Sequence, residues 1–179
     1  MIMKKTMVTF LIIGLPVNAV CCDNEMVKNE ILEVTEQNSI TELKEFYEAS
    51  IDCVDFNAKY DFDNTLLHKA VLRKADIEII KFLLEHGANI NSININKETP
   101  LMAGAWSGSL EAVKQLISYG GTSINATNRW GKTALMLAAK ENELEVVQYL
   151  IDQGADVNAK GQLIFQECTF TLNYFLYLN

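Results

Sequence analysis

Residues 133–158 read TALMLAAKENELEVVQYLIDQGADVN, and this stretch decides the fold. It holds two short apolar runs, each with the spacing of an amphipathic helix. Thr133 precedes the first run, where a threonine caps the N-terminus of a helix. Gly154 follows the second run, where a glycine provides a left-handed C-terminal cap. The stretch therefore predicts one helix–turn–helix unit.

The same unit recurs with a period of 33 or 34 residues. Its first helices begin after Thr65, Thr99 and Thr133, which are spaced 34 residues apart. Small residues recur inside these helices, where we expect them to let the next repeat approach closely: Ala70, Gly104 and Ala138. Two more residue types recur with the same period. Glycines end the second helices, where we expect left-handed caps: Gly87, Gly120 and Gly154. Asparagines recur at the ends of the repeats, where we expect turns: Asn57, Asn91, Asn125 and Asn158. A fixed period of this length indicates a stacked solenoid.

These units resemble ankyrin repeats, which have a period of about 33 residues and a Thr-Pro-Leu-His-x-Ala signature. The resemblance covers three repeats in residues 57–160, and the segment from Thr65 to Ala70 keeps the signature histidine. Met102 and Met136 stand in the place of that histidine in the next two repeats. The resemblance implies an all-α fold, an ankyrin-repeat solenoid of helix–turn–helix units with projecting β-hairpin-like turns.

Residues 1–19 read as a bacterial-type signal peptide. Lys4 and Lys5 precede the apolar run 7–15, and Ala19 suits cleavage after it. The run is shorter than the roughly 20 residues that span a bilayer. Cys21 and Cys22 follow, so two interpretations stay open: export to the periplasm or medium, or a lipid anchor in the cell envelope on one of these cysteines. A third interpretation is a buried first helix.

The remaining segments flank the repeats. Residues 20–56 read as a degenerate N-terminal capping repeat, because Ser39–Glu42 forms a capping box. Four apolar residues there share one helical face: Ile40, Leu43, Phe46 and Tyr47. Residues 161–179 form a hydrophobic C-terminal tail, which either folds over the open end of the last repeat or comes from a truncated reading frame.

Charge and composition exclude several classes of function. The chain has 15 Lys and Arg against 23 Asp and Glu, a net charge of −8, which argues against a nucleic-acid binder. Residues 23–63 alone hold 12 acidic and 3 basic residues. The four cysteines lack the spacing of a metal site, and neither His68 nor His86 belongs to a catalytic set. We therefore expect no catalytic residue, metal ion or cofactor. The resemblance implies that His68 bonds to the backbone of a neighbouring turn.

The resemblance also implies where a partner binds. In ankyrin stacks the turns form the fingers of a cupped hand, and the first helices form its palm. The candidate partner-binding residues are Phe62, Ile95, Asn96, Arg129, Trp130 and Lys132 on the fingers, with Trp106 and Lys140 on the palm. Trp130 beside Arg129 stands out, because these residue types dominate binding hot spots. Trp130 either contacts the partner or folds onto the neighbouring turn.

We therefore expect an exported, monomeric, non-enzymatic module that binds another protein through its turns and concave helix face. One alternative is an inhibitor- or immunity-like protein, whose acidic residues 23–63 mask a basic partner. A second alternative is an enzyme subunit with chemistry in the turns or the tail. We expect membrane attachment only through lipidation of Cys21 or Cys22.

Overall fold

The computed structural model describes residues 24–49 and 54–161, and the chain divides into two compact units at Asp55 and Phe56. The first unit holds α2 (Asn24–Glu36) and α3 (Ile40–Ala49). Three predicted features lie outside the described residues. The expected signal peptide covers residues 1–19, and the expected C-terminal tail covers residues 161–179, of which only Gly161 is described. All four cysteines also lie outside: Cys21, Cys22, Cys53 and Cys168.

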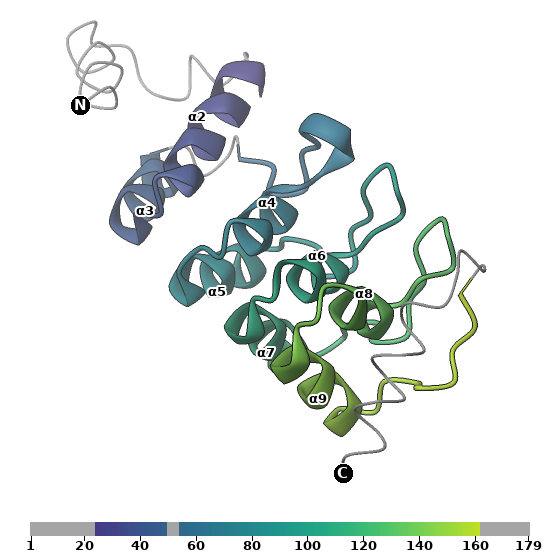
Figure 1. Cartoon of the computed structure of the whole chain (residues 1–179). Helices are drawn as coiled ribbons and strands as arrows, with labels where there is room; N and C mark the ends of the chain where they lie inside the picture. The colour runs from purple at the N-terminus through teal and green to yellow at the C-terminus, as the bar shows by residue number, and fades with distance from the viewer. Residues whose placement is uncertain (1–23, 50–53, 162–179) are drawn as a thin grey trace, which may run out of the picture. The chain divides into compact units, whose positions relative to one another are not determined.

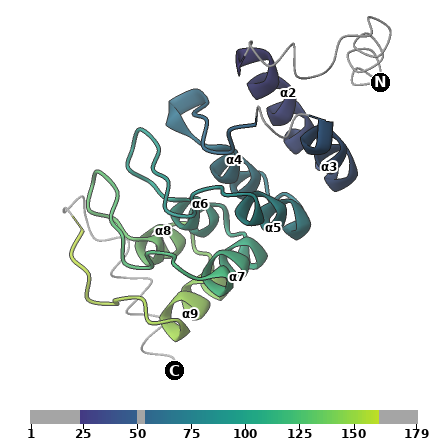
Figure 2. The ribbon, with the colours of Figure 1, turned by 180° about the vertical axis from the view of Figure 1, so that it is seen from behind.

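The second unit is built from three helix pairs. The described pairs are α4 (Leu66–Leu72) with α5 (Ile77–Glu85), α6 (Pro100–Ser107) with α7 (Leu110–Tyr119), and α8 (Ala134–Lys140) with α9 (Leu144–Asp152). Figures 1 and 2 show α4, α6 and α8 side by side in one row, with α5, α7 and α9 in a second row. Within the described ranges there is no strand, and the predicted all-α class is confirmed.

The threonine column begins each first helix from a buried position. The Thr99 hydroxyl accepts a hydrogen bond from the Met102 backbone N–H at 3.3 Å, and Thr133 accepts one from Met136 at 3.4 Å. Such side-chain caps satisfy backbone donors that the helix cannot pair internally. The Thr65 hydroxyl lies 2.9 Å from Nδ1 of His68. The predicted helix starts are therefore confirmed.

Two of the three predicted glycine caps have the expected geometry. At the end of α9, Ala155 N–H donates to Leu150 O and Gly154 N–H donates to Ile151 O, both at 2.9 Å. Gly154 has φ +86°, which glycine adopts without a steric penalty. This is a Schellman motif. Gly87, with φ +90°, ends α5 through the equivalent pair of hydrogen bonds.

The same prediction is wrong for Gly120. Its backbone has φ 90° and ψ 164°, which lies outside the left-handed helical region. An extra residue, Gly121, follows and displaces the backbone N–H that would close the motif. The Thr122 hydroxyl instead donates to Leu116 O at 2.7 Å, so a side chain replaces the missing backbone donor.

Small residues bring neighbouring repeats close together, as predicted. A Cβ atom placed on Gly104 in α6 would lie 3.0 Å from Cγ2 of Val113 and 3.2 Å from Cγ1 of Val71. Ala70 and Ala138, at the same position of α4 and α8, are fully buried. Protein interiors are close-packed, so a larger side chain at Gly104 would push α6 away from α7 of its own repeat and from α4 of the preceding repeat.

The first unit uses the same local devices as the second. The Glu42 backbone N–H donates to the Ser39 hydroxyl at 3.3 Å, which begins α3. Asn38 joins α2 to α3 with φ 57°. The corresponding junctions of the second unit also take positive φ at Lys74, Gly108 and Asn142. The core of the first unit is apolar: Ile31, Val34, Leu43 and Phe46.

We expect Gly154→Val to lower the free energy of unfolding by about 1–2 kcal/mol, because a β-branched residue is strained at φ +86°. No atom lies within 4 Å of the added Cβ, so the cost is conformational and not a clash. The measurement is urea unfolding followed by circular dichroism. Gly154→Asn is the matched control, since asparagine tolerates this conformation. Equal unfolding midpoints for the two variants would contradict the assignment.

Candidate functional site

Three turns precede the first helices of the second unit, and each is closed as a short hairpin would be. We call them turn 1 (residues 60–64), turn 2 (residues 94–98) and turn 3 (residues 128–132). In turn 2, Asn94 N–H donates to Glu98 O at 3.1 Å and Lys97 N–H donates to Asn94 O at 2.9 Å. Turns 1 and 3 make the equivalent bonds. The fourth residue of each turn is left-handed: Asp63, Lys97 and Gly131.

Backbone hydrogen bonds also join each turn to the next. Ile95 N–H donates to Phe62 O, and Arg129 N–H donates to Asn96 O, both at 2.9 Å. These bonds repeat with the sequence period, as the rungs of a β-ladder do. They bring the predicted finger residues of three separate repeats to one rim. Figure 1 shows the three loops projecting on the same side of the helices.

Two asparagines that the sequence analysis missed shape turns 2 and 3. Asn128 is buried, and its Oδ1 accepts hydrogen bonds from the backbone N–H groups of Trp130 at 3.0 Å and Lys132 at 2.9 Å. Asn94 Oδ1 accepts the same pair of bonds in turn 2, from Asn96 and Glu98. Asparagine favours turns because its side chain bonds to backbone two residues ahead. The 34-residue spacing of Asn94 and Asn128 was the available signal.

The asparagine column identified from the sequence connects repeats as well as forming turns. Asn91 Nδ2 donates to Gly121 O at 2.7 Å, and its Oδ1 accepts from Ser123 N–H at 3.0 Å. Asn57 makes the equivalent pair with the backbone of the repeat that follows it. Asn125 Oδ1 accepts from Asp156 N–H at 2.9 Å. Each of these three asparagines therefore binds backbone about 30 residues further along the chain.

The Glu98 carboxylate lies half-buried between the turns. It accepts hydrogen bonds from Nδ2 of Asn94 at 3.2 Å and, more weakly, from Nδ2 of Asn128 at 3.5 Å. Asn94 Nδ2 also donates to Asn64 Oδ1 at 3.1 Å. Asn64 of turn 1 and Asn128 of turn 3 thus join Asn94 and Glu98 of turn 2 in a polar network beneath the rim. This network holds the single carboxylate of turn 2 in place.

His68 connects the helix row to turn 2, which confirms its predicted role. Its Nε2 lies 2.9 Å from Glu98 O, and its Nδ1 lies 3.3 Å from the Thr65 backbone nitrogen. A carbonyl only accepts and a backbone N–H only donates, so the proton of the neutral ring is on Nε2. The ring is fully buried, and this burial lowers the pKa of His68 below its ordinary value.

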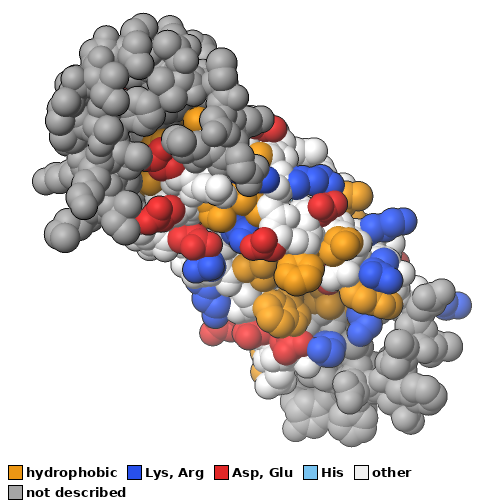
Figure 3. All heavy atoms as spheres, turned by 90° about the horizontal axis from the view of Figure 1, so that it is seen from above, with side chains coloured by type: hydrophobic (Ala, Val, Ile, Leu, Met, Phe, Trp, Pro, Cys, Tyr) orange, Lys and Arg blue, Asp and Glu red, His pale blue; other side chains and the backbone are white. Residues whose placement is uncertain are grey.

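A groove of about 250 Å³ lies between the turns and the row of first helices. Its exposed aromatic side chains are Phe62, 74% exposed, and Trp106, 51% exposed. Figure 3 shows hydrophobic side chains gathered on this face of the second unit, with charged side chains around them. The residues that line the groove are Phe62, Asn64, Leu72, Asn94, Asn96, Glu98, Met102, Ala103, Trp106 and Leu137.

The structure distributes the predicted partner-binding residues over three positions. Phe62, Asn96 and Trp106 line the groove. Ile95 is exposed on turn 2, and Lys132 closes turn 3. Lys140 pairs with Glu141 at 2.7 Å, and this hydrogen bond lowers the pKa of the Glu141 carboxyl.

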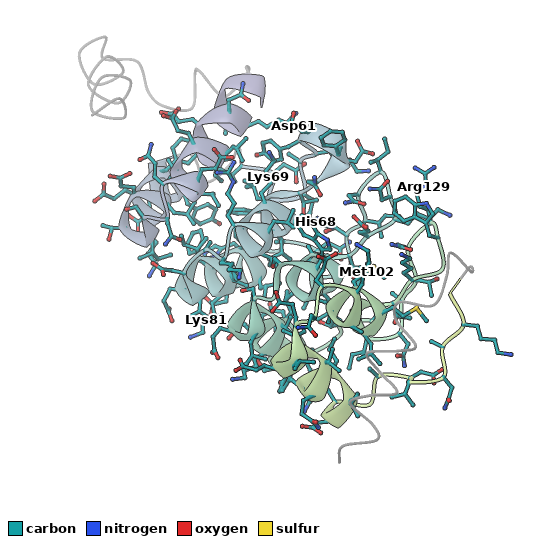
Figure 4. The ribbon with its side chains drawn as sticks, viewed as in Figure 1. Asp61, His68, Lys69, Lys81, Met102 and Arg129 are labelled. Carbon is teal, nitrogen blue, oxygen red and sulfur yellow. The ribbon has the colours of Figure 1, made fainter. Side chains whose placement is uncertain are left out.

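Arg129 and Trp130 form a stacked pair on turn 3. The Arg129 guanidinium lies 5.1 Å from the centre of the Trp130 ring, within the range of a cation–π contact. Arg129 also donates to Asn96 Oδ1 at 3.4 Å. Figure 4 shows Arg129 at the outer end of its turn, away from the helices. Trp130 is 36% exposed, so part of the ring is covered while part remains available.

A family model described as ankyrin repeats in three copies matches residues 24–128 and 67–161. The chain belongs to the ankyrin-repeat family. The matched ranges include the helices of the first unit as well as all three helix pairs of the second. Ankyrin repeats are generally protein–protein interaction modules, and the family is typically non-enzymatic. No curated protein matches this ankyrin-repeat chain.

Two further findings concern metals and membranes. Across residues 24–49 and 54–161, no cluster of three His, Cys, Asp or Glu side chains could hold a metal ion. In the same part of this ankyrin-repeat chain, every helix is too short or too polar to cross a bilayer.

We expect the stability of the protein to fall as the pH drops below about 6.5, because of His68. Burial lowers its folded-state pKa, so the unfolded chain binds the proton first and gains stability as the pH falls. The contribution of the neutral His68 ring to the free energy of unfolding is complete above the pKa of histidine in the unfolded chain. It is lost as the pH falls towards the lower pKa of His68 in the folded protein. The measurement is the free energy of unfolding in urea between pH 8 and pH 5.

His68→Met is the matched control, since methionine occupies the same repeat position at Met102 and Met136. We expect the variant to lose less stability than the wild type over this pH range. Parallel pH profiles would show that His68 does not carry the effect.

Proposed function

We propose that this chain binds a partner protein, as a monomer, through turns 1–3 and the adjoining face of α4, α6 and α8. The observation that carries the proposal is the groove in which Phe62 and Trp106 stay exposed. Exposed apolar patches of this kind mark interaction sites. Large aromatic anchors in a pocket supply most of the binding energy of many interfaces.

The backbone at Phe62 supports this proposal. Phe62 has φ 58° and ψ 28°, a left-handed conformation that is strained for an aromatic residue. Its surroundings hold it there, through the bond from Ile95 N–H and through ion pairs that join Asp61 to Lys69 at 3.3 Å and Asp63 to Lys59 at 3.1 Å. Strain of this kind persists where the surrounding structure over-determines it, and it concentrates at functional sites.

The chemistry of the groove also supports binding rather than catalysis. The Glu98 carboxylate accepts amide hydrogen bonds, and both ring nitrogens of His68 contact neighbouring groups. General acid–base catalysis needs a proton-transfer group within hydrogen-bond reach of a substrate. Neither side chain is placed as such a group, which favours an interaction module over an enzyme subunit.

The test is site-specific photo-crosslinking with benzoylphenylalanine, an aromatic analogue that suits positions already holding aromatic residues. We expect positions 62 and 106 to crosslink one protein from cells or medium of the source organism. Position 119 on α7, where Tyr119 is 48% exposed, is the matched control and should not crosslink it. Equal crosslinking from position 119 would contradict a defined face.

The captured protein is then purified and its binding to Phe62→Gly is measured. Glycine relieves the positive φ at this position, so the variant stays folded while the aromatic anchor is lost. We expect binding to weaken by tenfold or more. A further crosslinking position, Tyr47 on α3, tests the inhibitor-like alternative, which the 12 acidic residues within 23–63 favour. Capture from position 47 alone would support that alternative.

We further propose that the chain is exported, on the strength of the signal-like pattern in residues 1–19. Intact mass and N-terminal sequencing of the protein produced in a bacterial host provide the test. We expect the mature chain to begin at Val20. A chain that begins at Cys21 and carries acyl mass would indicate a lipid anchor. A chain recovered from the host cytoplasm with Met1 in place would contradict export.

A further inference from the structure

Within the described ranges, turns 2 and 3 carry three basic side chains that form no salt bridge, although the charge of Lys132 helps to lower the pKa of the Glu141 carboxyl. In the part of the chain that the structure describes, Lys97, Arg129 and Lys132 make no ion pair. Turn 1 differs, because both of its aspartates are paired with lysines. The outer lysines Lys81 and Lys114 are also paired, each with a glutamate three residues away. Positive charge outside any salt bridge therefore collects on turns 2 and 3, although the chain as a whole has a net charge of −8.

The turns that carry these cations are closed by backbone hydrogen bonds. Arg129 stacks on Trp130 at 5.1 Å and donates to Asn96 Oδ1, while its backbone N–H bonds to Asn96 O. Lys132 follows in the same closed turn, and Lys97 occupies the left-handed position of turn 2. Side chains on a fixed backbone lose less freedom on binding, which favours their use as contacts.

The carboxylate of Glu98 in turn 2 does not form a salt bridge with Lys97, Arg129 or Lys132. Glu98 is half-buried and accepts hydrogen bonds from the amide groups of Asn94 and Asn128. Its negative charge is therefore directed into the network beneath the rim. The outer surface of turns 2 and 3 presents cations next to Ile95, which is 58% exposed, and the groove with Phe62 and Trp106 lies beside them.

We propose that the partner presents an acidic segment containing at least one large apolar side chain. Its carboxylates pair with Lys97, Arg129 and Lys132, and its apolar side chain enters the groove at Phe62 and Trp106. Arginine binds carboxylates through two parallel hydrogen bonds, so Arg129 adds geometric selectivity. The proposal rests on the proposed function and specifies the chemistry of the partner.

A carboxylate partner fits this surface better than a nucleic acid does. A phosphate backbone carries closely spaced charges and needs a continuous basic face. Here Asp61 and Asp63 on turn 1 and Glu98 in the groove interrupt such a face. A peptide with a few separated carboxylates can pair with Lys97, Arg129 and Lys132 without placing a negative charge beside Asp61, Asp63 or Glu98.

The test is selection of random 12-residue peptides on the full chain, followed by affinity measurements on the best peptide. We expect the selected peptides to be enriched in Asp and Glu around an apolar residue. Binding of the best peptide should weaken at least tenfold in the variant K97E/R129E/K132E. It should also weaken as the ionic strength rises, because the paired charges lie at the surface.

The matched control reverses three charges elsewhere on the same unit, K74E/K81E/K114E. Figure 4 shows Lys81 on α5, on the opposite side of the unit from Arg129. Binding to this variant should change by no more than about twofold at physiological ionic strength, because its substitutions lie on α5, on α7 and at the junction between α4 and α5, outside turns 1–3, and exposed charges are screened. Far-ultraviolet circular dichroism verifies that both triple variants are folded.

Several results would overturn the proposal. These are selected peptides without acidic enrichment, no peptide selected above background, equal weakening in both triple variants, or tighter binding of a 20-nucleotide single-stranded DNA or RNA. The double variant F62G/W106A distinguishes a failure of the acidic-partner proposal from a failure of the proposed function. If it abolishes peptide binding while K97E/R129E/K132E does not, the face binds partners but has no preference for acids. If neither variant affects binding, the proposed function fails as well.

Discussion

Gly104 lies so close to Val71 and Val113 that a methyl group added there would meet both side chains. This contact sets the separation of α4, α6 and α7, because each is apolar on the side that the contact buries. A single helix pair cannot bury its apolar face alone, so its stability comes from its neighbours. The spacing of the helices then sets the spacing of the turns that precede them. The groove and its rim depend on that spacing.

Polar side chains keep the stacked repeats in register. Asn57, Asn91 and Asn125 bind backbone groups of the following repeat, while Asn94 and Asn128 shape the turns. Hydrogen bonds are directional, so they specify one register where apolar packing alone tolerates several. Among the described residues, no buried side-chain nitrogen or oxygen lacks a partner. Asn128 is itself buried, and its Oδ1 satisfies two backbone N–H groups of turn 3.

The binding surface combines this rigid support with side chains that stacking does not constrain. His68 links the core to turn 2 through Glu98 O, and Phe62 O links turn 1 to turn 2. The exposed side chains on these turns can differ between proteins without disturbing the helices, which is why functional residues concentrate in such segments. In this chain the positions carry aromatic groups on turn 1 and α6, and cations on turns 2 and 3. That combination underlies both the proposed function and the proposed chemistry of the partner.

The periodicity of the sequence by itself determined the all-α repeat fold, because Thr65, Thr99 and Thr133 begin helices through local hydrogen bonds that depend on few neighbours. The resemblance to ankyrin repeats also implied that Phe62, Asn96 and Trp106 belong to one binding face, and all three line the groove. The sequence contains the extra residue Gly121 after Gly120, but only the structure decided that the Thr122 hydroxyl takes over the cap, at 2.7 Å from Leu116 O. Only the tertiary structure also decided which of the described cations form no salt bridge. Pairing depends on distances between side chains of different turns, and those distances follow from packing rather than from order along the chain.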